Sequence, residues 1–316
     1  MMMPRSPLEP FLEQQSAIIL DGGLATALEA QGHNLNDSLW SAKLLIEAPD
    51  AIKQMHEIYL AAGADCIASA TYQASLQGFQ SRGLDAEEAR GMMKDATRLA
   101  VAARDEFWEK QGAPTERIRP VVAASVGPYG AFLSNGSEYT GEYGVTKTEL
   151  YDFHRPRWDV LQRESADLLA CETIPSLPEV EVLLRLLEES PETWAWLSFS
   201  CRDGEHLCDG SAIGDAVSAC DRLPNVAAVG INCTTPLHIS SLLAIAQEHT
   251  QKPIIVYPNL GERFDAVSKT WGAEPPVNDW LTSAARWVAE GARGVGGCCR
   301  IGPETIRQLR ERVLEQ

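Results

Sequence analysis

The sequence predicts a single (β/α)₈ barrel of the α/β class, and three observations support this fold class. Eight short apolar runs recur along the 316 residues, and each is followed by a stretch with the apolar spacing of a helix. Runs such as Val121-Val122-Ala123-Ala124 are continuously apolar, which is typical of parallel strands buried on both faces. No break in composition divides the chain, so one barrel is favoured over a doubly wound sheet, in which the strand order reverses midway. The doubly wound sheet is the alternative architecture.

The predicted strands are these eight runs, taken in chain order. They cover residues 17–23, 66–71, 120–127, 167–173, 194–200, 226–233, 253–259 and 294–299. Thr146 and Ser176 each precede a glutamate by three residues, as in a helix capping box, and Gly63 and Gly291 stand where helices should stop. Residues 1–15 precede the first strand and are predicted as an N-terminal tail, which leaves 16–316 as the barrel domain.

Two predicted connections are too long to be simple turns. Residues 128–146 follow the third strand and residues 260–279 follow the seventh, and both are rich in Gly, Tyr, Trp, Asn and Pro. Loops that follow barrel strands overhang the carboxyl-terminal end of the barrel, where active sites lie. We therefore expect both segments to act as lids.

Charge and composition exclude several classes of function. A net charge of -17 and a pI near 4.8 argue against nucleic-acid binding, which needs clustered Lys and Arg. The first residues lack the apolar core of a signal peptide, and no stretch approaches the roughly 18 apolar residues of a membrane span. We expect a cytoplasmic protein without a membrane partner. Its eight cysteines are then expected to be thiols or metal ligands rather than a disulfide framework.

Acids and thiols stand at the ends of several predicted strands. Asp21 ends the first strand, Glu172 the fourth, Cys233 the sixth and the pair Cys298-Cys299 the eighth. No Lys or His ends a strand, which disfavours Schiff-base aldolases and hydrolases with imidazole ligands. Because barrel enzymes carry their reactive groups at these ends, the acids and thiols are candidates for one site.

Three of the cysteines fit a metal centre. Adjacent residues of a strand point to opposite faces, so Cys298 and Cys299 can share one ion with Cys233 only if the backbone bends, and Gly296-Gly297 supply that freedom. Three thiolates suit zinc, which in catalytic sites keeps one position open for substrate. The alternative is that all three cysteines are small buried apolar residues.

The other cysteines are weaker candidates. Cys171 precedes Glu172, so strand alternation turns its side chain outward against the helices, into the core. Cys201 and Cys208 with His206 could form a second metal cluster, but their spacing is not that of a zinc ribbon or knuckle. We therefore expect one metal site in the chain.

Three short motifs resemble the homocysteine S-methyltransferase family. They are Leu20-Asp21-Gly22-Gly23 with Thr26 and Glu29, Gly230-Ile231-Asn232-Cys233, and Gly296-Gly297-Cys298-Cys299-Arg300. Residues 34–42, 71–74, 125–131, 136–139, 153–157, 170–173 and 256–259 resemble the bacterial S-methylmethionine-dependent branch more than the betaine-dependent or folate-dependent ones. The resemblance spans 17–309. It implies a barrel enzyme with one zinc ion per chain, ligated by Cys233, Cys298 and Cys299.

The resemblance also implies how homocysteine would bind. Asp21 and Glu172 would bind its amino group, and backbone amides near Gly22, Gly23 and Ser125 its carboxylate. Methyl transfer to a thiol that has lost its proton needs no acid and base pair, which favours ammonium binding for the two acids. The alternatives are a turn or cap role for Asp21 and a salt bridge to an arginine for Glu172.

The chemistry expected is methyl transfer to a thiolate, with methionine as the product. A free thiol titrates near pH 8.5, whereas coordination to zinc removes its proton. The donor expected is a sulfonium, S-methylmethionine first and S-adenosylmethionine second, ahead of betaine and methylfolate. The candidates for the donor pocket are Tyr72, Tyr129, Tyr139, Trp271 and Asn259, whose aromatic members could face the cation or merely pack a lid.

Two alternatives from other classes stay open from the sequence. A phosphate-binding lyase on the same fold would want a glycine-rich anion cradle and usually a Lys or His, where this chain has cysteines. A non-catalytic zinc or thiol-binding protein would want four protein ligands rather than three. Leu260 departs from the small polar residue expected in this branch, which leaves its effect on the donor loop undecided.

Overall fold

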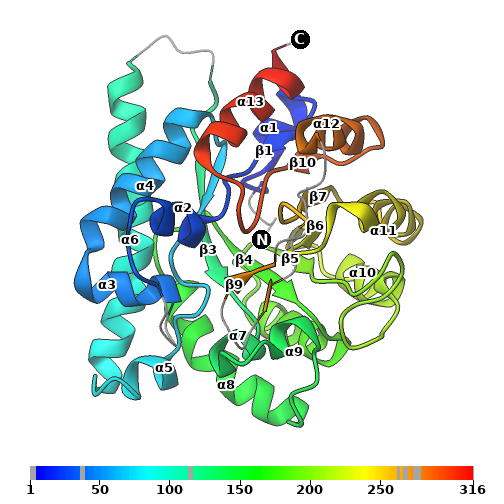
Figure 1. Ribbon diagram of the computed structural model, residues 1–316. Helices are drawn as coiled ribbons and strands as arrows, with labels where there is room; N and C mark the ends of the chain where they lie inside the picture. Colours follow the sequence, from blue (N-terminus) through cyan, green and yellow to red (C-terminus); the bar gives the residue numbers. More distant parts are fainter. Residues whose placement is uncertain are drawn as a thin grey trace.

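Eight parallel strands form the inner wall of a barrel (Figure 1). The computed structural model describes residues 5–35, 40–112, 117–261, 264–265, 270–272 and 279–315. The strands are β1 (Ile18–Ile19), β2 (Cys66–Ala68), β3 (Val121–Val126), β4 (Leu168–Ile174), β5 (Ala195–Phe199), β6 (Val226–Asn232), β7 (Ile254–Tyr257) and β10 (Gly294–Val295). Each overlaps a predicted run, and only β4 extends past its run, by the single residue Ile174, so all eight predicted strands are confirmed.

The barrel closes between its first two strands. The hydrogen-bonded order is β1-β10-β7-β6-β5-β4-β3-β2, so every strand lies next to its neighbour in the barrel sequence. A parallel bridge joins Leu20 to Cys66, and the Asp65 amide donates to the Ile19 carbonyl at 2.7 Å. A doubly wound sheet would reverse its strand order, so that alternative is excluded and the (β/α)₈ barrel, or TIM barrel, is confirmed.

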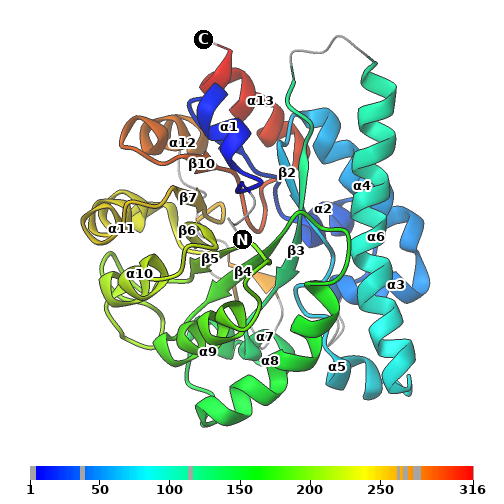
Figure 2. The same cartoon turned by 180° about the vertical axis from the view of Figure 1, so that it is seen from behind.

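Helices surround the barrel in both views (Figures 1 and 2). They are α1 (Glu9–Gln14), α2 (Leu24–Ala30), α3 (Leu44–Glu47), α4 (Pro49–Ala62), α5 (Leu76–Gln80), α6 (Ala86–Gln111), α7 (Tyr129–Leu133), α8 (Lys147–Leu161), α9 (Leu177–Glu188), α10 (Ile213–Asp221), α11 (Pro236–His249), α12 (Trp280–Ala289) and α13 (Pro303–Leu314), with 3₁₀ turns η1 (Trp40–Lys43) and η2 (Ser137–Tyr139). No helix in the described ranges combines the length and hydrophobicity needed to cross a membrane.

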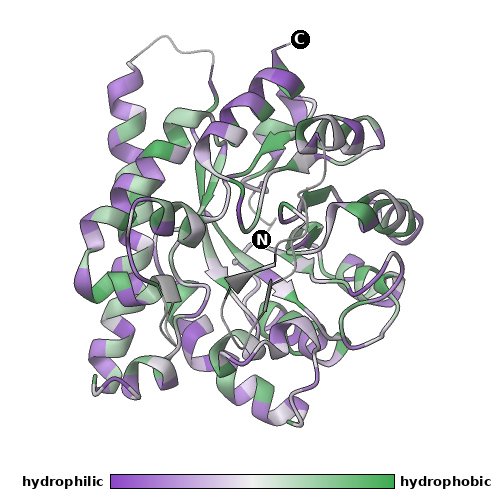
Figure 3. Cartoon of the chain, in the orientation of Figure 1, coloured by the Kyte–Doolittle hydropathy of each residue, from purple (hydrophilic) through white to green (hydrophobic). Residues whose placement is uncertain are grey.

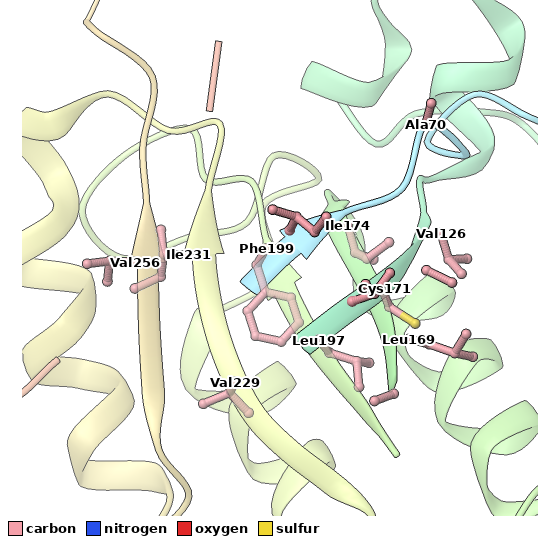
Figure 4. Close-up of a cluster of buried hydrophobic side chains, with 14 of the residues drawn as sticks. Ala70, Val126, Leu169, Cys171, Ile174, Leu197, Phe199, Val229, Ile231 and Val256 are labelled. Carbon is pink, nitrogen blue, oxygen red and sulfur yellow. The ribbon is translucent and has the colours of Figure 1, made fainter. Parts of the chain in front are cut away.

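Strand alternation divides the apolar residues into an outer and an inner layer. Leu169, Cys171 and Ile174 of β4 lie in the outer layer, between the strands and the helices (Figure 4). Leu168 and Ala170 of the same strand belong to the inner cluster. Figure 3 shows hydrophobic colour on the strands and mixed colour on the helices, as expected when a helix buries only one face. The outward placement predicted for Cys171 is confirmed.

The first residues do not form a separate tail. Glu9–Gln14 form helix α1, and Leu8 and Phe11 are buried in the inner cluster. Arg293 donates to the Leu12 carbonyl at 2.7 Å, and α1 lies beside α13 in both views. The segment before residue 16 thus packs on the barrel, because two of its apolar side chains lie in the inner cluster.

One of the two predicted capping boxes forms. Thr146 and Glu149 exchange the expected hydrogen bonds at the start of α8. Ser176 makes no side-chain cap on α9, because Glu179 turns inward and is fully buried, accepting from the Tyr129 amide at 2.6 Å. The three-residue spacing therefore predicted where both helices begin, but it predicted the capping hydrogen bonds correctly only at Thr146.

The two predicted lid segments contain short elements of their own. Residues 128–146 include α7 and η2, and α7 and η2 pack on one another. In residues 260–279, β8 (Phe264–Asp265) pairs antiparallel with β9 (Thr270–Trp271), and the intervening residues lie outside the described ranges. Leu260 packs against the outer apolar cluster, so its side chain serves the core.

Candidate metal centre and substrate site

Three cysteine sulfurs meet at the carboxyl end of the barrel. Cys233 directly follows β6, and Cys298 and Cys299 follow β10. The three Sγ atoms all lie within 4.8 Å of one another, with 3.9 Å between those of Cys298 and Cys299. Cys233 and Cys298 are joined as a disulfide in this structure. The predicted meeting of the three sulfurs is confirmed, and a metal would bind the reduced state.

Two departures from strand geometry bring the sulfurs together. β10 ends at Val295, so the alternation of a strand no longer applies to Cys298 and Cys299, and the Ile301 amide closes a turn on the Cys298 carbonyl at 3.2 Å. Cys233 adopts a left-handed φ of 47°, which is uncommon for a residue with a side chain and often marks functional sites. These turns, rather than a regular strand, aim the three side chains at one point.

Glycine is needed at positions 296 and 297 because the neighbouring atoms leave no room for a side chain. Neither has a left-handed φ, in contrast to the freedom predicted for them. A Cβ on Gly296 would lie 2.5 Å from the Leu20 Cβ, and one on Gly297 would overlap the Ile301 side chain. The segment that carries two of the sulfurs can pack against the end of β1 only because these side chains are absent.

The donor set fits a thiophilic metal ion. Three sulfurs and no imidazole is the ligand type that selects zinc and other soft-ligand metals. Burial raises the pKa of the Cys299 thiol to about 12, and the nearby Glu29 carboxylate adds to the shift. A cation among the sulfurs would reverse this effect, because it favours the thiolate. Three protein ligands also leave room for a fourth from a substrate.

Two carboxyl groups, Asp21 and Glu172, lie at the same end of the barrel without a cationic partner. Asp21 Oδ2 accepts from the Ala68 amide at 2.9 Å, and Glu172 accepts from the hydroxyl of Ser125. Burial raises the pKa of both, and the charge of Glu172 raises that of Asp21 further. Among the described residues neither carboxylate pairs with an Arg or Lys, so the salt bridge considered for Glu172 is absent there.

A network of inward-facing polar side chains supports Glu172. Tyr257 bonds to Glu172 and to Ser198, and the Trp196 indole donates to the Tyr257 hydroxyl at 3.1 Å. Asn232 Oδ1 accepts from the Ser198 hydroxyl at 3.0 Å and from a β4 amide at 2.8 Å. These residues occupy alternate positions of β5, β6 and β7. Sequence reasoning missed them, although alternation from Glu172 could have suggested inward polar positions on neighbouring strands.

The backbone amides predicted for carboxylate binding differ in availability. The Gly23 amide donates to the Ile301 carbonyl at 3.0 Å, and the Ser125 amide donates to the Ser69 hydroxyl at 3.2 Å. The Gly22 amide has no acceptor in the described chain, and a Cβ there would overlap the Ile301 carbonyl. Of the three, Gly22 is therefore best suited to donate to a ligand.

Two of the candidate aromatics interact electrostatically with the Cys299 thiol. Burial raises the pKa of the Tyr72 and Tyr139 hydroxyls well above the usual range, and the negative charge of a Cys299 thiolate adds to both shifts. A buried Arg157 donates to the Tyr72 carbonyl and the Gly127 carbonyl, each at 3.1 Å, and so holds the loop that carries Tyr72. Tyr72 and Tyr139 therefore remain the candidates for the donor pocket.

The other candidates for the donor pocket have different surroundings. Tyr129 packs edge-on against Phe153, with ring centroids 4.9 Å apart, and so takes the lid-packing role considered for it. Asn259 accepts from the Gly261 amide at 3.0 Å in the turn after β7. The side chain of Trp271 lies outside the described part of the structure.

The second cysteine cluster does not form. His206 Nδ1 lies 3.0 Å from an Asp203 carboxylate oxygen, and the Cys208 thiol is 3.5 Å from the Ser200 hydroxyl. Within the described ranges, the three sulfurs at the barrel mouth are the only group of His, Cys, Asp and Glu side chains close enough to hold a metal. Among the described residues, the structure therefore agrees with the expected single metal site.

Comparison with known proteins gives consistent matches over nearly the whole chain. The family model described as homocysteine S-methyltransferase matches residues 18–313. Homocysteine S-methyltransferase YbgG of Bacillus subtilis is 49% identical over 304 residues, covering 96% of each chain. The metallated form of the Escherichia coli homocysteine methyltransferase MmuM superimposes with a TM-score of 0.86 at 41% identity, covering 97% of this chain and 100% of that one. Its oxidised form gives 0.87 at 42% identity, covering 98% and 100%.

Proposed function

This chain belongs to the homocysteine S-methyltransferase family and is a homocysteine S-methyltransferase, and from that premise we propose that it uses zinc and a sulfonium methyl donor. The observation that carries the proposal is the set of three convergent sulfurs beside two carboxylates that lack a cationic partner. The barrel domain in this proposal extends from the described amino end, including α1, to α13.

Zinc is the metal that best suits this ligand set. Cys233, Cys298 and Cys299 would each supply a thiolate, and zinc takes such sulfur ligands at about 2.3 Å in tetrahedral geometry. The chemistry that bound zinc would supply is removal of the thiol proton of homocysteine, which leaves a sulfur nucleophile at neutral pH. Reduction of the Cys233–Cys298 disulfide must come first, because all three sulfurs are needed as ligands.

Asp21 and Glu172 would hold the ammonium group of homocysteine. Both residues are half-buried and have no Arg or Lys partner in the described chain, so an ammonium would supply the missing charge. The Gly22 amide would donate to the homocysteine carboxylate. Together these contacts would fix the amino acid end of the substrate and direct its sulfur toward the cysteines.

The transfer step forms one bond and breaks one. The homocysteine sulfur attacks the methyl carbon, and the carbon–sulfur bond of the donor breaks, its electron pair staying on the donor sulfur. The sulfonium becomes a neutral thioether, and homocysteine becomes methionine. Opposite charges disappear in this step, so a water-poor pocket favours it. Tyr72 and Tyr139, whose hydroxyls are sensitive to the charge of Cys299, would face the cation.

A donor comparison on the reduced, zinc-loaded enzyme tests this proposal. Homocysteine is supplied with S-methylmethionine, S-adenosylmethionine, betaine or methyltetrahydrofolate, and methionine is measured. We expect turnover with S-methylmethionine, slower turnover with S-adenosylmethionine and none with the other two. Turnover only with betaine or methyltetrahydrofolate contradicts the sulfonium assignment.

X-ray absorption at the zinc edge tests the metal step separately. We expect homocysteine to add one sulfur neighbour to the three from the protein. An unchanged sulfur shell in an active enzyme rules out direct coordination of the substrate. An enzyme that turns over fully after zinc is chelated excludes the zinc role altogether.

A further inference from the structure

We propose that Glu138, in the segment 128–146, is the carboxylate that recognises the positively charged sulfonium of the methyl donor. This role rests on the proposed function, because it requires a donor that carries a positive charge next to the transferred methyl group. It assigns different carboxylates to the two substrates, with Asp21 and Glu172 serving homocysteine.

The backbone of Glu138 is fixed over the end of β5. Glu138 lies in η2, and the hydroxyl of Ser200, which follows β5, donates to the Glu138 carbonyl at 3.3 Å. Gly130 of α7 packs against this turn so closely that a Cβ there would overlap the Glu138 amide. The turn is therefore held at the mouth of the barrel.

The Glu138 carboxylate is only partly satisfied. Its Oε2 atom is buried and has no partner in the described chain, and the backbone amides of Gly136 and Glu138 offset only part of the effect of burial on its pKa. A buried carboxylate oxygen without a donor is costly, so such a group needs a reason to be kept. A ligand cation would supply the missing interaction. Burial also raises the pKa of Glu138 to about 7, and a cation would favour its charged form.

Hydrogen bonds place Glu138 at the mouth of the barrel, next to Tyr139 in the chain. The Ser200 hydroxyl that donates to the Glu138 carbonyl also contacts the carbonyl of Thr173, the residue after Glu172, at 3.4 Å. The charge of Glu138 also helps to raise the pKa of the Tyr72 and Tyr139 hydroxyls. A carboxylate beside two tyrosines can hold a cation that has no hydrogen to donate, because both interactions are electrostatic. A sulfonium is such a cation.

Glu138 is separated electrostatically from the homocysteine carboxylates. The charge of Glu172 shifts the pKa of Asp21, but Glu138 is not among the groups that shift the pKa of either. Glu138 stands on η2 over the end of β5, whereas Asp21 follows β1 and Glu172 lies in β4. The proposal thus assigns the two substrates to carboxylates on different elements of the barrel mouth.

The proposal predicts an effect on donor binding without an effect on the chemical step. The positive charge of the sulfonium decreases as the methyl group leaves, so Glu138 attracts the ground state at least as strongly as the transition state. Interactions of this kind lower KM without raising kcat. Loss of the positive charge also favours release of the product, because Glu138 no longer attracts the neutral thioether.

Kinetics of Glu138→Gln on the reduced, zinc-loaded enzyme test this role. We expect KM for S-methylmethionine to rise about 10–100-fold, as for loss of a charged interaction, with kcat, the homocysteine KM and the zinc content unchanged. Methionine, a neutral thioether that competes with the donor, should inhibit the variant and the parent enzyme equally. Glu138→Asp should recover part of the lost affinity. The matched control is Glu142→Gln, an exposed acid in the same segment, which should behave as the parent.

Four outcomes overturn the proposal. They are an unchanged KM for S-methylmethionine, a raised KM for homocysteine, a loss of zinc, and an equal weakening of methionine inhibition, which would place the donor ammonium on Glu138. Failure of the proposed function looks different, because the parent enzyme would then accept no sulfonium donor before any variant is compared. A thermal melt of Glu138→Gln that matches the parent excludes misfolding as the cause of a raised KM.

Discussion

The two ends of the barrel interior are built from the same strands but from opposite kinds of side chain. In β4, Leu168 and Ala170 face inward near the amino end, and Glu172 occupies the next inward position near the carboxyl end. β7 changes in the same way from Ile255 to Tyr257. The amino end is closed by the apolar side chains of α1, whereas the carboxyl end is lined by hydroxyl, amide and carboxyl groups.

Within the inner layer, the residues at the amino end therefore contribute mainly to stability, and those at the carboxyl end mainly to function. Inward apolar residues at the amino end contribute burial, and their removal leaves a cavity. Inward polar residues at the carboxyl end bond to one another, and they leave unsatisfied groups beside the sulfurs. Substitutions at the two ends should therefore affect different measurements.

The largest expected effect is the loss of a sulfur at the carboxyl end. Cys233→Ala should remove bound zinc and lower turnover at least about 10³-fold, from about tenfold less thiolate near neutral pH and about 10²-fold poorer positioning of the substrate. Zinc content and methionine formation are the measurements. The control is Cys171→Ala, whose sulfur lies in the outer layer (Figure 4) and whose loss should spare both. Substantial activity in Cys233→Ala contradicts the metal site.

At the amino end, Phe11→Ala should reduce stability without changing substrate binding. Its fully buried ring closes the barrel, so the free energy of unfolding should fall by about 3–5 kcal/mol. Urea unfolding measures this, and steady-state kinetics on the folded variant should give the parental KM for both substrates. Glu13→Gln on the exposed face of α1 should change stability by less than about 0.5 kcal/mol. A changed KM in Phe11→Ala would show that the two ends are coupled.

The smallest of the three effects concerns the ammonium contact of homocysteine. Glu172→Gln keeps the shape of the side chain but removes its charge, so KM for homocysteine should rise about 10–100-fold. The analogue 4-mercaptobutyrate, which lacks the amino group, should react equally with variant and parent. Glu188→Gln, an exposed acid on α9, is the control. An equal loss with the analogue would mean that Glu172 acts on the fold of the site and not on the ammonium.

The strands and the candidate metal ligands could be predicted because each depends on local pattern. Continuous apolar runs gave the positions of all eight barrel strands, since a strand covered on both faces needs apolar residues at every position. The thiols and acids followed from reading which residues end those runs. Strand alternation, counted from Glu172, correctly predicted that the side chain of Cys171 points outward.

Features that depend on distant partners could not be predicted in this way. Glu179 has the spacing of a capping residue, but His154 and Tyr143 take its carboxylate at 2.8 and 3.0 Å instead. Leu8 and Phe11 are too few to form an apolar run, and only the open amino end of the barrel explains their burial. The role of Gly296 and Gly297 likewise depended on what packs against them.

The sequence by itself determined where the strands lie along the chain and which thiol and carboxyl groups follow them, because these follow from periodicity and from the rule that barrel sites lie at strand ends. The closed strand order came from the tertiary structure. Only the tertiary structure decided that the sulfurs of Cys298 and Cys299 meet that of Cys233, that Asp21 and Glu172 lack a cationic partner in the described chain, and that a carboxylate oxygen of Glu138 is buried without a partner there. These properties are distances between residues remote in sequence, and folding alone sets such distances.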